Sequence, residues 1–568
     1  MIIERDISIP TNDGSVVLAD IFRPIDGKPA PVIMTLGPYG KGIRYKDGFT
    51  PQWNWMMKTY PDILPGSTRE YMVWETVDPE IWVKWGYVCL RVDSRGAGRS
   101  PGLLDILSPR ETQDYYDAIE WAGIQPWSNG KVGLNGISYY AINQWLVASL
   151  QPPHLAAMIP WEGAADFYRD FARHGGILSN GFLDVWYPRQ VVSVQHGNPA
   201  AHMDVWLDDL ASGPQRLTEG ELSKNRTEPL HNILDHPLDD QFYRDRSPDW
   251  SRVTVPFLSA ANWAGYGLHT RGNFEAFTQA ASTQKWLECH PGRHEEWFYL
   301  DRGMVLQKRF LDHFLKGENN GWQNEPPVLL HMRRAFSDEF EQRKEMSWPL
   351  DRTKWVSMYL SASDTSLERD APLRETAVTF NALREPITFM GPPLVVETEL
   401  TGPLAAKLFL SPSTIDADLF LTLQAFSPDG REVDFQGTID PRTPLAQGWL
   451  RASHRKLDPS KSKPYRPYHS HDEIQPLRPD EVYELDVEIW PTSVILPKGY
   501  RLALQISGQD FERKWVGQGN EAWVSKGSGP WLHTNKTDRP TEIFGGKTTI
   551  YTGGDRRSYL TLPIIGSR

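Results

Sequence analysis

The stretch from Lys131 to Trp145 reads KVGLNGISYYAINQW and could place a serine where it acts as a nucleophile. A short apolar run leads to Gly136, and Ser138 follows just before an apolar, alanine-containing helical pattern. This order predicts a strand, a sharp turn and a helix, with the serine at the apex. A serine at such an elbow is exposed above the sheet, next to the free N–H groups of a helix N-terminus, and those donors can stabilise an oxyanion.

The elbow motif is incomplete, so the short motif leaves two interpretations open. The usual pattern is G-x-S-x-G, and Tyr140 stands where the second glycine would be. Ser138 can be a catalytic nucleophile, or it can be an ordinary helix N-cap in a strand-to-helix turn. The rest of the chain has to decide between them.

The composition limits the classes of protein to which the chain can belong. A chain of 568 residues suggests about two to four domains. The hydrophobic fraction of 40% and the charged fraction of 23% are typical of globular proteins. A formal net charge of −12 argues against nucleic acid as the main partner. We see no secretory signal at the N-terminus and no apolar stretch long enough to cross a bilayer, so we expect a cytoplasmic protein without a membrane partner.

Two cysteines, Cys89 and Cys289, each lie in an apolar, strand-like run. We expect both to be buried thiols, and their small number excludes a disulfide framework.

In the first half of the chain, apolar strand patterns alternate with helical patterns. This alternation predicts a mostly parallel sheet with helices on both faces, and such sheets bind ligands at the carboxyl ends of their strands. Tyr39, Asp93, Ser138 and Glu162 each follow directly after a strand pattern. We therefore expect these four side chains to lie at the same edge of the sheet.

Changes in pattern suggest three domains. Residues 165–250 are charged, helical and irregular, without clear strands, and predict a helical cap inserted into the sheet domain. The sheet pattern resumes afterwards, so residues 1–164 and 251–335 form one discontinuous α/β domain. After Trp348, short alternating strands recur between turn signals, which predicts an all-β sandwich over residues 345–568.

A nucleophilic serine needs a base, and the chain order of α/β-hydrolases places the histidine last, after the final strand. His290 and His294 both lie in that place. Their spacing could also suggest zinc on a helix face, but Pro291 and Gly292 between them disfavour a continuous helix, so we expect no metal site. Either histidine can also have a purely structural role.

Several motifs together resemble one family of hydrolases. They are GPYGK with Tyr39, VDSRGAG with Asp93, GISYYA with Ser138, and the C-terminal segments TGPLAAKLFLSPS, DADLFLTL and LPKGYRLALQIS. They are similar to the CocE/NonD (cocaine esterase/glutaryl-acylase) serine hydrolases, relatives of the X-Pro dipeptidyl-peptidases, over almost the whole chain. The resemblance implies an α/β-hydrolase core, a helical cap and a C-terminal jelly-roll β-sandwich, with esterase or amidase chemistry and no cofactor.

Carried over by motif, the resemblance implies a role for each of four residues. Ser138 is the nucleophile, and the Tyr39 hydroxyl and the Tyr139 N–H form the oxyanion hole. His294 is the base, because it ends a stretch that matches the family pattern G-P-W-x-H. The chemistry supports Tyr39, since a phenol beside the elbow can donate to a developing oxyanion, although Tyr39 can instead be an aromatic plug.

One departure from the family concerns the acid of the triad. The family carries an Asp two residues after a Trp, whereas here Gly265 stands two residues after Trp263. Glu162 ends the preceding strand and is our candidate acid, with Asp166 as second choice. A buried carboxylate there would fix the tautomer of the imidazole and stabilise the imidazolium. The alternative is that Glu162 pairs with Arg169 or another cation of the cap.

The resemblance assigns a structural role to Asp93 and Arg95, which we expect to form an internal ion pair that braces their loop. Candidates for the wall of the substrate pocket come from the cap and its border, and each can equally be a core residue: Trp161, Phe167, Arg169, His174 and Trp186.

The sequence thus predicts a serine hydrolase that cleaves a small ester or amide through a covalent acyl-enzyme. An acyltransferase on the same scaffold is an alternative, and so is a non-catalytic ligand-binding relative, for which the missing acid at Gly265 is the main argument. The identity of the substrate and the formation of a homo-oligomer stay open.

Overall fold

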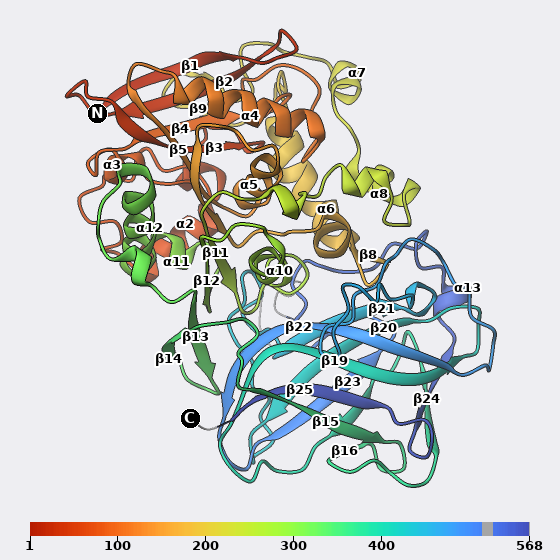
Figure 1. The fold of residues 1–568 in the computed structure, drawn as a ribbon. Helices are drawn as coiled ribbons and strands as arrows, with labels where there is room; N and C mark the ends of the chain where they lie inside the picture. Colours follow the sequence, from red (N-terminus) through yellow and green to blue (C-terminus); the bar gives the residue numbers. More distant parts are fainter. Residues whose placement is uncertain (514–525, 567–568) are drawn as a thin grey trace.

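A computed structural model of the chain describes residues 1–513 and 526–566. Figure 1 shows two main parts, an N-terminal α/β part and a C-terminal part built from strands, with the N-terminus on the first and the C-terminus on the second.

The α/β part is built on one mixed sheet. Strands β3, β4, β5, β6, β11, β12 and β13 run parallel to one another, while β1, β2 and β14 at the two edges are antiparallel to their neighbours. The spatial order is β1 (Ile2–Pro10), β2 (Val16–Arg23), β4 (Val88–Asp93), β3 (Ala30–Gly37), β5 (Ser128–Ile137), β6 (Leu155–Trp161), β11 (Phe257–Asn262), β12 (Lys285–His290), β13 (Val328–Arg334) and β14 (Phe340–Glu345). This is the mostly parallel sheet that the alternating pattern predicted.

Helices α4 (Pro109–Gly123), α5 (Tyr139–Ser149), α10 (Arg271–Gln279) and α12 (Asp301–Leu311) pack on this sheet. Helix α4 is capped at its start, because the Ser108 hydroxyl accepts the N–H of Glu111 at 3.2 Å and Pro109 occupies the first turn. Helix α5 is buried along nearly its whole length, as expected for a mostly apolar helix. It follows Ser138 directly.

Only the second half of the apolar run from Trp82 to Val92 forms a strand, β4. Residues Pro79–Trp82 instead form the helical turn α3, which is capped by the Asp78 carboxylate. Gly86 then adopts φ +81°, a conformation that glycine reaches at little cost, and the chain turns into β4.

The segment 165–250 contains short helices and also four two-residue strands, which its irregular pattern did not predict. The helices are η1 (Phe167–Ala172), α6 (Asn180–Trp186), η2 (Tyr187–Val191), η3 (Val192–Val194), α7 (Glu219–Leu222), η4 (Ser223–Asn225), α8 (Pro229–Asp235) and α9 (Gln241–Arg244). The strands are β7 (Arg173–His174), β8 (Ile177–Leu178), β9 (Met203–Asp204) and β10 (Asp209–Leu210). Strands β7 and β8 pair because Gly175 and Gly176 between them adopt positive φ and reverse the chain.

Nine of the C-terminal strands pair in a series that closes on itself. In order around the series they are β15 (Thr353–Ser361), β25 (Tyr559–Ile565), β19 (Thr398–Pro412), β22 (Tyr483–Leu496), β21 (Ala446–Arg451), β20 (Asp418–Phe426), β23 (Arg501–Ser507), β18 (Ile387–Met390) and β16 (Ser366–Glu368). Strand β22 also pairs with β13, so backbone hydrogen bonds join the two parts.

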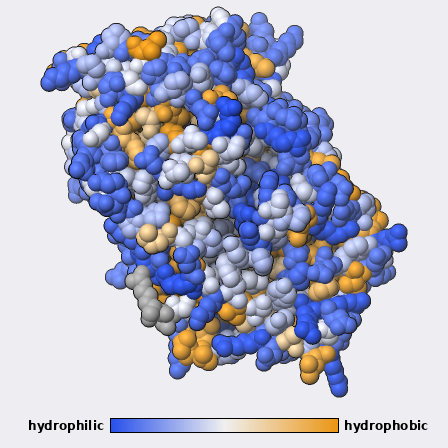
Figure 2. All heavy atoms as spheres, in the orientation of Figure 1, coloured by the Kyte–Doolittle hydropathy of each residue, from blue (hydrophilic) through white to orange (hydrophobic). Residues whose placement is uncertain are grey.

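Cys89 and Cys289 are both buried free thiols, as predicted. Among the described helices we find none that is long and apolar enough to span a membrane. Figure 2 shows apolar residues scattered among polar ones over the viewed face.

Candidate active site

Ser138 sits at a strained elbow between β5 and α5. Its backbone has φ 58° and ψ −114°, a region that costs a non-glycine residue free energy. Its N–H donates to the carbonyl of Trp161 at 3.0 Å, which fixes the turn against β6. Gly136 leaves the necessary space, because a Cβ there would lie 2.6 Å from the Cβ of Tyr140. The Ser138 side chain makes no capping hydrogen bond, so it does not act as an ordinary N-cap.

The hydroxyl of Ser138 faces a histidine that the sequence analysis did not single out. Its Oγ lies 3.5 Å from Nε2 of His269, and both side chains are buried. His269 follows β11, in the segment where the family carries its acid. The rings of His269 and His294 are stacked, with centroids 4.7 Å apart and an interplanar angle of 21°.

His294 is held by two carboxylates. Its Nδ1 lies 2.6 Å from Oε2 of Glu162, and its Nε2 lies 3.0 Å from Oε1 of Glu75. The structure therefore brings the predicted pair Glu162 and His294 together, while the second nitrogen of His294 faces Glu75. Arg169, the alternative partner of Glu162, binds Asp166 and Asp239 instead.

A second buried histidine extends this network. His290 lies 2.8 Å from Oε1 of Glu162 through Nε2, and 2.8 Å from Oε2 of Glu288 through Nδ1. His290 ends β12 and does not lie in a loop, because it continues the pairing with β11. Within residues 1–513 and 526–566, no three His, Cys, Asp or Glu side chains are arranged to hold a metal ion.

The three imidazoles differ in pKa because their surroundings differ. Burial opposes charge on His294, but the charge of Glu162 and hydrogen bonds to Glu162 and Glu75 raise its pKa to about 10. Similarly, Glu288 and Glu162 overcome burial and raise the pKa of His290 to about 9. For His269, burial and the charge of His294 lower the pKa to about 3. At neutral pH, His290 and His294 are imidazolium ions and His269 is neutral.

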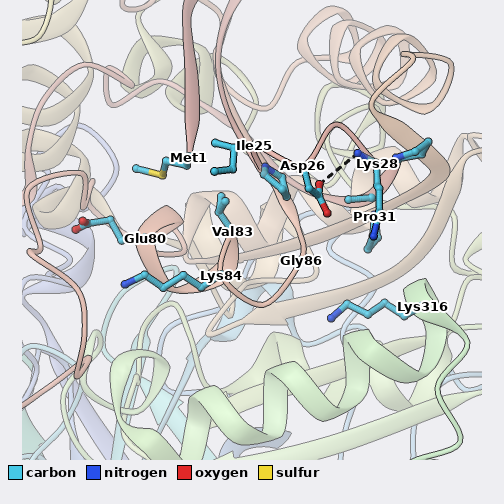
Figure 3. Close-up of a pocket in the computed structure, with 13 residues that line it drawn as sticks. Met1, Ile25, Asp26, Lys28, Pro31, Glu80, Val83, Lys84, Gly86 and Lys316 are labelled. Carbon is cyan, nitrogen blue, oxygen red and sulfur yellow. Dashed lines mark hydrogen bonds between the residues drawn. The ribbon is translucent and has the colours of Figure 1, made fainter.

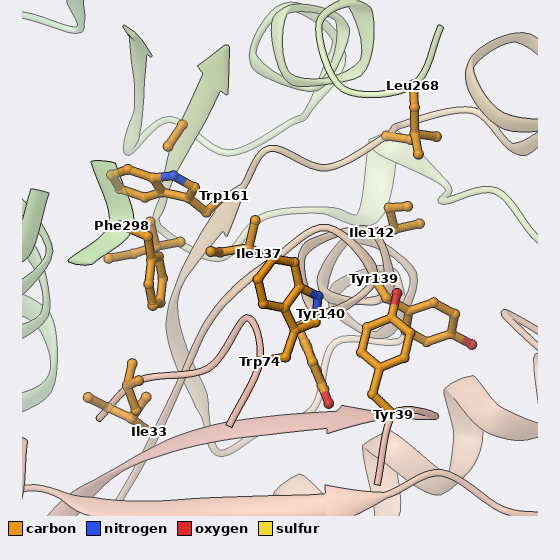
Figure 4. Close-up of a cluster of buried hydrophobic side chains, with 14 of the residues drawn as sticks. Ile33, Tyr39, Trp74, Ile137, Tyr139, Tyr140, Ile142, Trp161, Leu268 and Phe298 are labelled. Atoms are coloured by element: carbon orange, nitrogen blue, oxygen red, sulfur yellow. The ribbon is translucent and has the colours of Figure 1, made fainter. Parts of the chain in front are cut away.

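The proposed oxyanion donors lie beside the elbow. The rings of Tyr39 and Tyr139 meet with centroids 5.9 Å apart, and Figure 4 shows both near the start of α5. Oη of Tyr39 accepts a hydrogen bond from Nε1 of Trp186 at 3.0 Å. Burial and the charge of Glu75 raise the pKa of Tyr39, while hydrogen bonding with Trp186 and Ser138 partly offsets them. Tyr139 is the first residue of α5, so its N–H has no acceptor within the helix.

The residues predicted to line the pocket have other partners. Trp161 is fully buried and stacks on His290, and Phe167 stacks on Phe171. His174 contacts Nε2 of His533 through Nδ1 at 2.8 Å. Asp166, the second-choice acid, accepts hydrogen bonds from the backbone and the guanidinium of Arg169, as noted above.

The expected ion pair between Asp93 and Arg95 is not formed. Asp93 accepts the backbone N–H groups of Lys41 and Arg99, at 2.7 and 2.9 Å. Arg95 instead forms two hydrogen bonds with Asp114. Because Gly96 and Gly98 both adopt positive φ, the loop folds back on Asp93 and directs Arg95 toward α4. Asp93 and Arg95 thus act through different partners.

A separate pocket of about 590 Å³ opens on the surface of the α/β part (Figure 3). Its walls include Ile25, Val83, Lys84 and Lys316, and none of the residues around Ser138.

Sequence reasoning missed His269 and Glu75. Glu75 belongs to a polar and aromatic stretch without a motif. The one available signal was the segment from Trp263 to His269, because a histidine stands there near the missing acid.

Comparison with known proteins shows the family to which the chain belongs. Residues 13–296 match the model of the X-Pro dipeptidyl-peptidase (S15 family), and residues 320–561 match the X-Pro dipeptidyl-peptidase C-terminal non-catalytic domain. The cocaine esterase of Rhodococcus sp. (strain MB1 Bresler) is 22% identical over 99% of this chain and 98% of that protein. A Mycobacterium bovis protein named as a serine esterase is 25% identical over 88% of this chain and 90% of its own length.

A solved CocE/NonD family hydrolase from Staphylococcus aureus is 33% identical and superimposes with a TM-score of 0.84. The match covers 100% of this chain and 94% of that one. The chain therefore belongs to the CocE/NonD family of hydrolases, related to the X-Pro dipeptidyl-peptidases, and it is a serine hydrolase, a class of enzyme that acts on esters and amides.

Proposed function

We propose that this protein hydrolyses small esters or amides through a covalent acyl-enzyme on Ser138. The observation that carries the proposal is the strained elbow, which holds Oγ of Ser138 3.5 Å from an imidazole nitrogen and beside the phenol of Tyr39. Strain of this kind persists where the surrounding structure imposes it, and it is concentrated at functional sites.

In the proposed reaction, Ser138 Oγ attacks the carbonyl carbon while an imidazole of the stacked pair His269 and His294 removes its proton. The hydroxyl of Tyr39 and the N–H of Tyr139 donate to the tetrahedral oxyanion. The imidazolium then gives the proton to the leaving oxygen or nitrogen, and water attacks the acyl-enzyme by the same route. The proposal keeps the predicted partnership of His294 with Glu162.

We propose that segment 165–250 is a cap and that residues 345–568 form a jelly roll which shapes the pocket. Support comes from Trp531 of the C-terminal part, whose ring lies 6.3 Å from that of His269 and 6.1 Å from that of Phe182 in the cap. The backbone N–H of His294 also donates to the carbonyl of Thr438 at 3.1 Å. Both parts therefore reach the site from outside the α/β domain.

The enclosure of the site supports a small substrate. Only 7% of Ser138 is exposed. Ile142, one turn after Ser138, and Leu268, next to His269, are apolar (Figure 4). The proposed substrate pocket does not include Arg169 and His174. Arg169 binds carboxylates, and His174 contacts His533.

Turnover of a graded series of acyl esters and anilides, with Ser138→Ala as the variant, tests this proposal. We expect kcat to fall by about 10³-fold or more, because the nucleophile is lost, while circular dichroism stays unchanged. A fluorophosphonate should label the native protein and not the variant. Ser149→Ala, at the other end of α5, is the matched control and should retain activity.

Unchanged turnover in Ser138→Ala would refute the proposal. Product analysis in the presence of an added alcohol distinguishes hydrolysis from acyl transfer, since an acyltransferase would form mainly the new ester.

A further inference from the structure

His269 is the side chain placed to exchange a proton with Ser138. Its Nε2 lies 3.5 Å from Oγ of Ser138, whereas Nε2 of His294 is engaged by Glu75. A separation of 3.5 Å is long for a hydrogen bond, but catalytic contacts are often loose before substrate binds. His269 is also fixed on its backbone, because its N–H donates to the carbonyl of Gly265 at 2.8 Å.

Gly265 creates the space that His269 occupies. A Cβ built on Gly265 would lie 2.7 Å from Cβ of His269, closer than two such carbons approach in proteins. An aspartate at this position, as the family pattern has it, therefore conflicts with the observed place of His269. The missing acid and the histidine beside the serine are linked by one steric requirement.

Protonation also favours His269 over His294. A general base must have a free lone pair at the operating pH. His269 is neutral, while carboxylates on both nitrogens keep His294 protonated. For Nε2 to accept a proton, the ring hydrogen of neutral His269 must be on Nδ1.

We propose that His269 is a catalytic residue, the imidazole that takes the proton of the Ser138 hydroxyl, and that His294 is the positioning residue stacked behind it. This inference rests on the proposed function of Ser138. In this assignment, Glu162 and Glu75 hold His294, and His294 in turn orients His269.

The proton balance follows the acyl-enzyme route. The O–H bond of Ser138 breaks, its proton moves to Nε2 of His269, and Oγ bonds to the carbonyl carbon. As the bond from that carbon to the leaving group breaks, Nε2 returns the proton to the leaving atom. Water then gives one proton to Nε2 while its oxygen bonds to the acyl carbon, and Ser138 regains the proton when the acid product departs.

The surroundings act in both directions on the transient positive charge of His269. Burial and the charge of His294 oppose this charge, whereas the charge of Glu162 and hydrogen bonding with the backbone of Gly163 and Glu162 favour it. Glu162 is one of three carboxylates, with Glu75 and Glu288, in the network behind His269.

The test compares His269→Gln, His294→Gln and Ser138→Ala on an activated ester. We expect His269→Gln to lower kcat by about 10²- to 10⁴-fold with KM nearly unchanged, because proton transfer is lost and binding is not. Added imidazole should partly restore His269→Ala and should not restore His294→Ala or Ser138→Ala. His313→Gln, a surface histidine beside the carbonyl of Glu318, is the matched control and should be fully active.

Gly265→Ala provides a second variant in case the histidine variants do not fold. It should displace His269 and reduce kcat, while circular dichroism shows that the protein is still folded. A fully active His269→Gln, alongside inactive His294→Gln and Ser138→Ala, would overturn the assignment of His269 and leave the proposed function intact. An active Ser138→Ala would instead refute the proposed function itself.

Discussion

Nε2 of His294 lies 3.0 Å from Oε1 of Glu75, so this ring has a carboxylate at each nitrogen. Glu75 is buried and adopts φ +62°, and its backbone carbonyl accepts the N–H of Ile137 at 3.1 Å. The same residue therefore holds both the imidazole and the strand that leads into Ser138. Burial raises the pKa of Glu75, and the hydrogen bond from His294 opposes this rise.

Glu75→Gln should lower the pKa of His294. The amide keeps a similar shape but removes the negative charge that stabilises the imidazolium. We expect a downward shift in the titration of the His294 ring, measured by NMR with ¹³C-labelled histidine. Glu70→Gln, at a surface ion pair with Lys46, is the control and should leave this titration unchanged. An identical titration in Glu75→Gln and the native protein would contradict the role given to Glu75.

Three buried histidines, His174, His454 and His471, lie where the segment 165–250 meets the C-terminal strands. His174 contacts His533 at 2.8 Å, and Nδ1 of His454 lies 3.1 Å from Nδ1 of His471. Burial, followed by the charge of Arg451, lowers the pKa of His454 to about 3. Burial likewise lowers the pKa values of His174 and His471.

These histidines predict acid instability. An unfolded histidine titrates near 6.5, so below that pH the unfolded chain binds protons that the native protein excludes. Their stabilising contribution is present above pH about 6.5 and falls as pH decreases, by about 1.4 kcal/mol per pH unit for each histidine. Melting temperatures at pH 7.5, 6.0 and 5.0 should decrease, and less so in His454→Gln. Equal pH dependence in the two proteins would contradict the prediction.

The histidines of the active-site network predict the opposite behaviour at alkaline pH. The pKa values of His290 and His294 are raised to about 9 and about 10, so their stabilisation is complete below pH about 6.5 and is lost as pH rises through these values. We expect the melting temperature to fall between pH 7.5 and 9.5. Glu288→Gln should lower the pKa of His290 and reduce that alkaline dependence. A flat profile would show that His290 and His294 are not protonated in the native protein.

Local sequence signals predicted the elements that position the site. The elbow at Ser138 follows from a strand pattern, a glycine and a helical pattern, all within a few residues. The pairing of Glu162 with His294 was also predicted, although the two residues are far apart in the chain. That prediction worked because parallel strands end at one edge of the sheet, and β6 lies two strands from β12.

Other features depend on packing that no local pattern reports. His269 reaches Ser138 because Gly265 leaves space and because the chain turns back after β11. Glu75 reaches His294 from a stretch without regular periodicity. Arg95 was expected to pair with Asp93, but a glycine-rich loop directs it to Asp114. In each case the tertiary arrangement selects the partner among several charged or polar groups.

The contact between Trp186 and Tyr39 predicts that both residues affect catalysis. The indole N–H donates to Oη of Tyr39, so the phenol's own hydrogen remains available for an oxyanion. Tyr39→Phe should lower kcat by about 10²- to 10³-fold, as loss of an oxyanion donor typically does. Trp186→Phe keeps the aromatic stack and removes one neutral hydrogen bond, so kcat should fall by about 3- to 10-fold.

The double variant tests whether the two effects share one path. If Trp186 acts through the phenol, then Trp186→Phe should have no further effect on kcat in the Tyr39→Phe background. Multiplicative losses in the double variant would show that Trp186 acts independently, for example by shaping the pocket wall. Because Trp186 lies on α6 of the segment 165–250, coupled losses would mean that this segment takes part in stabilising the transition state as well as enclosing the substrate.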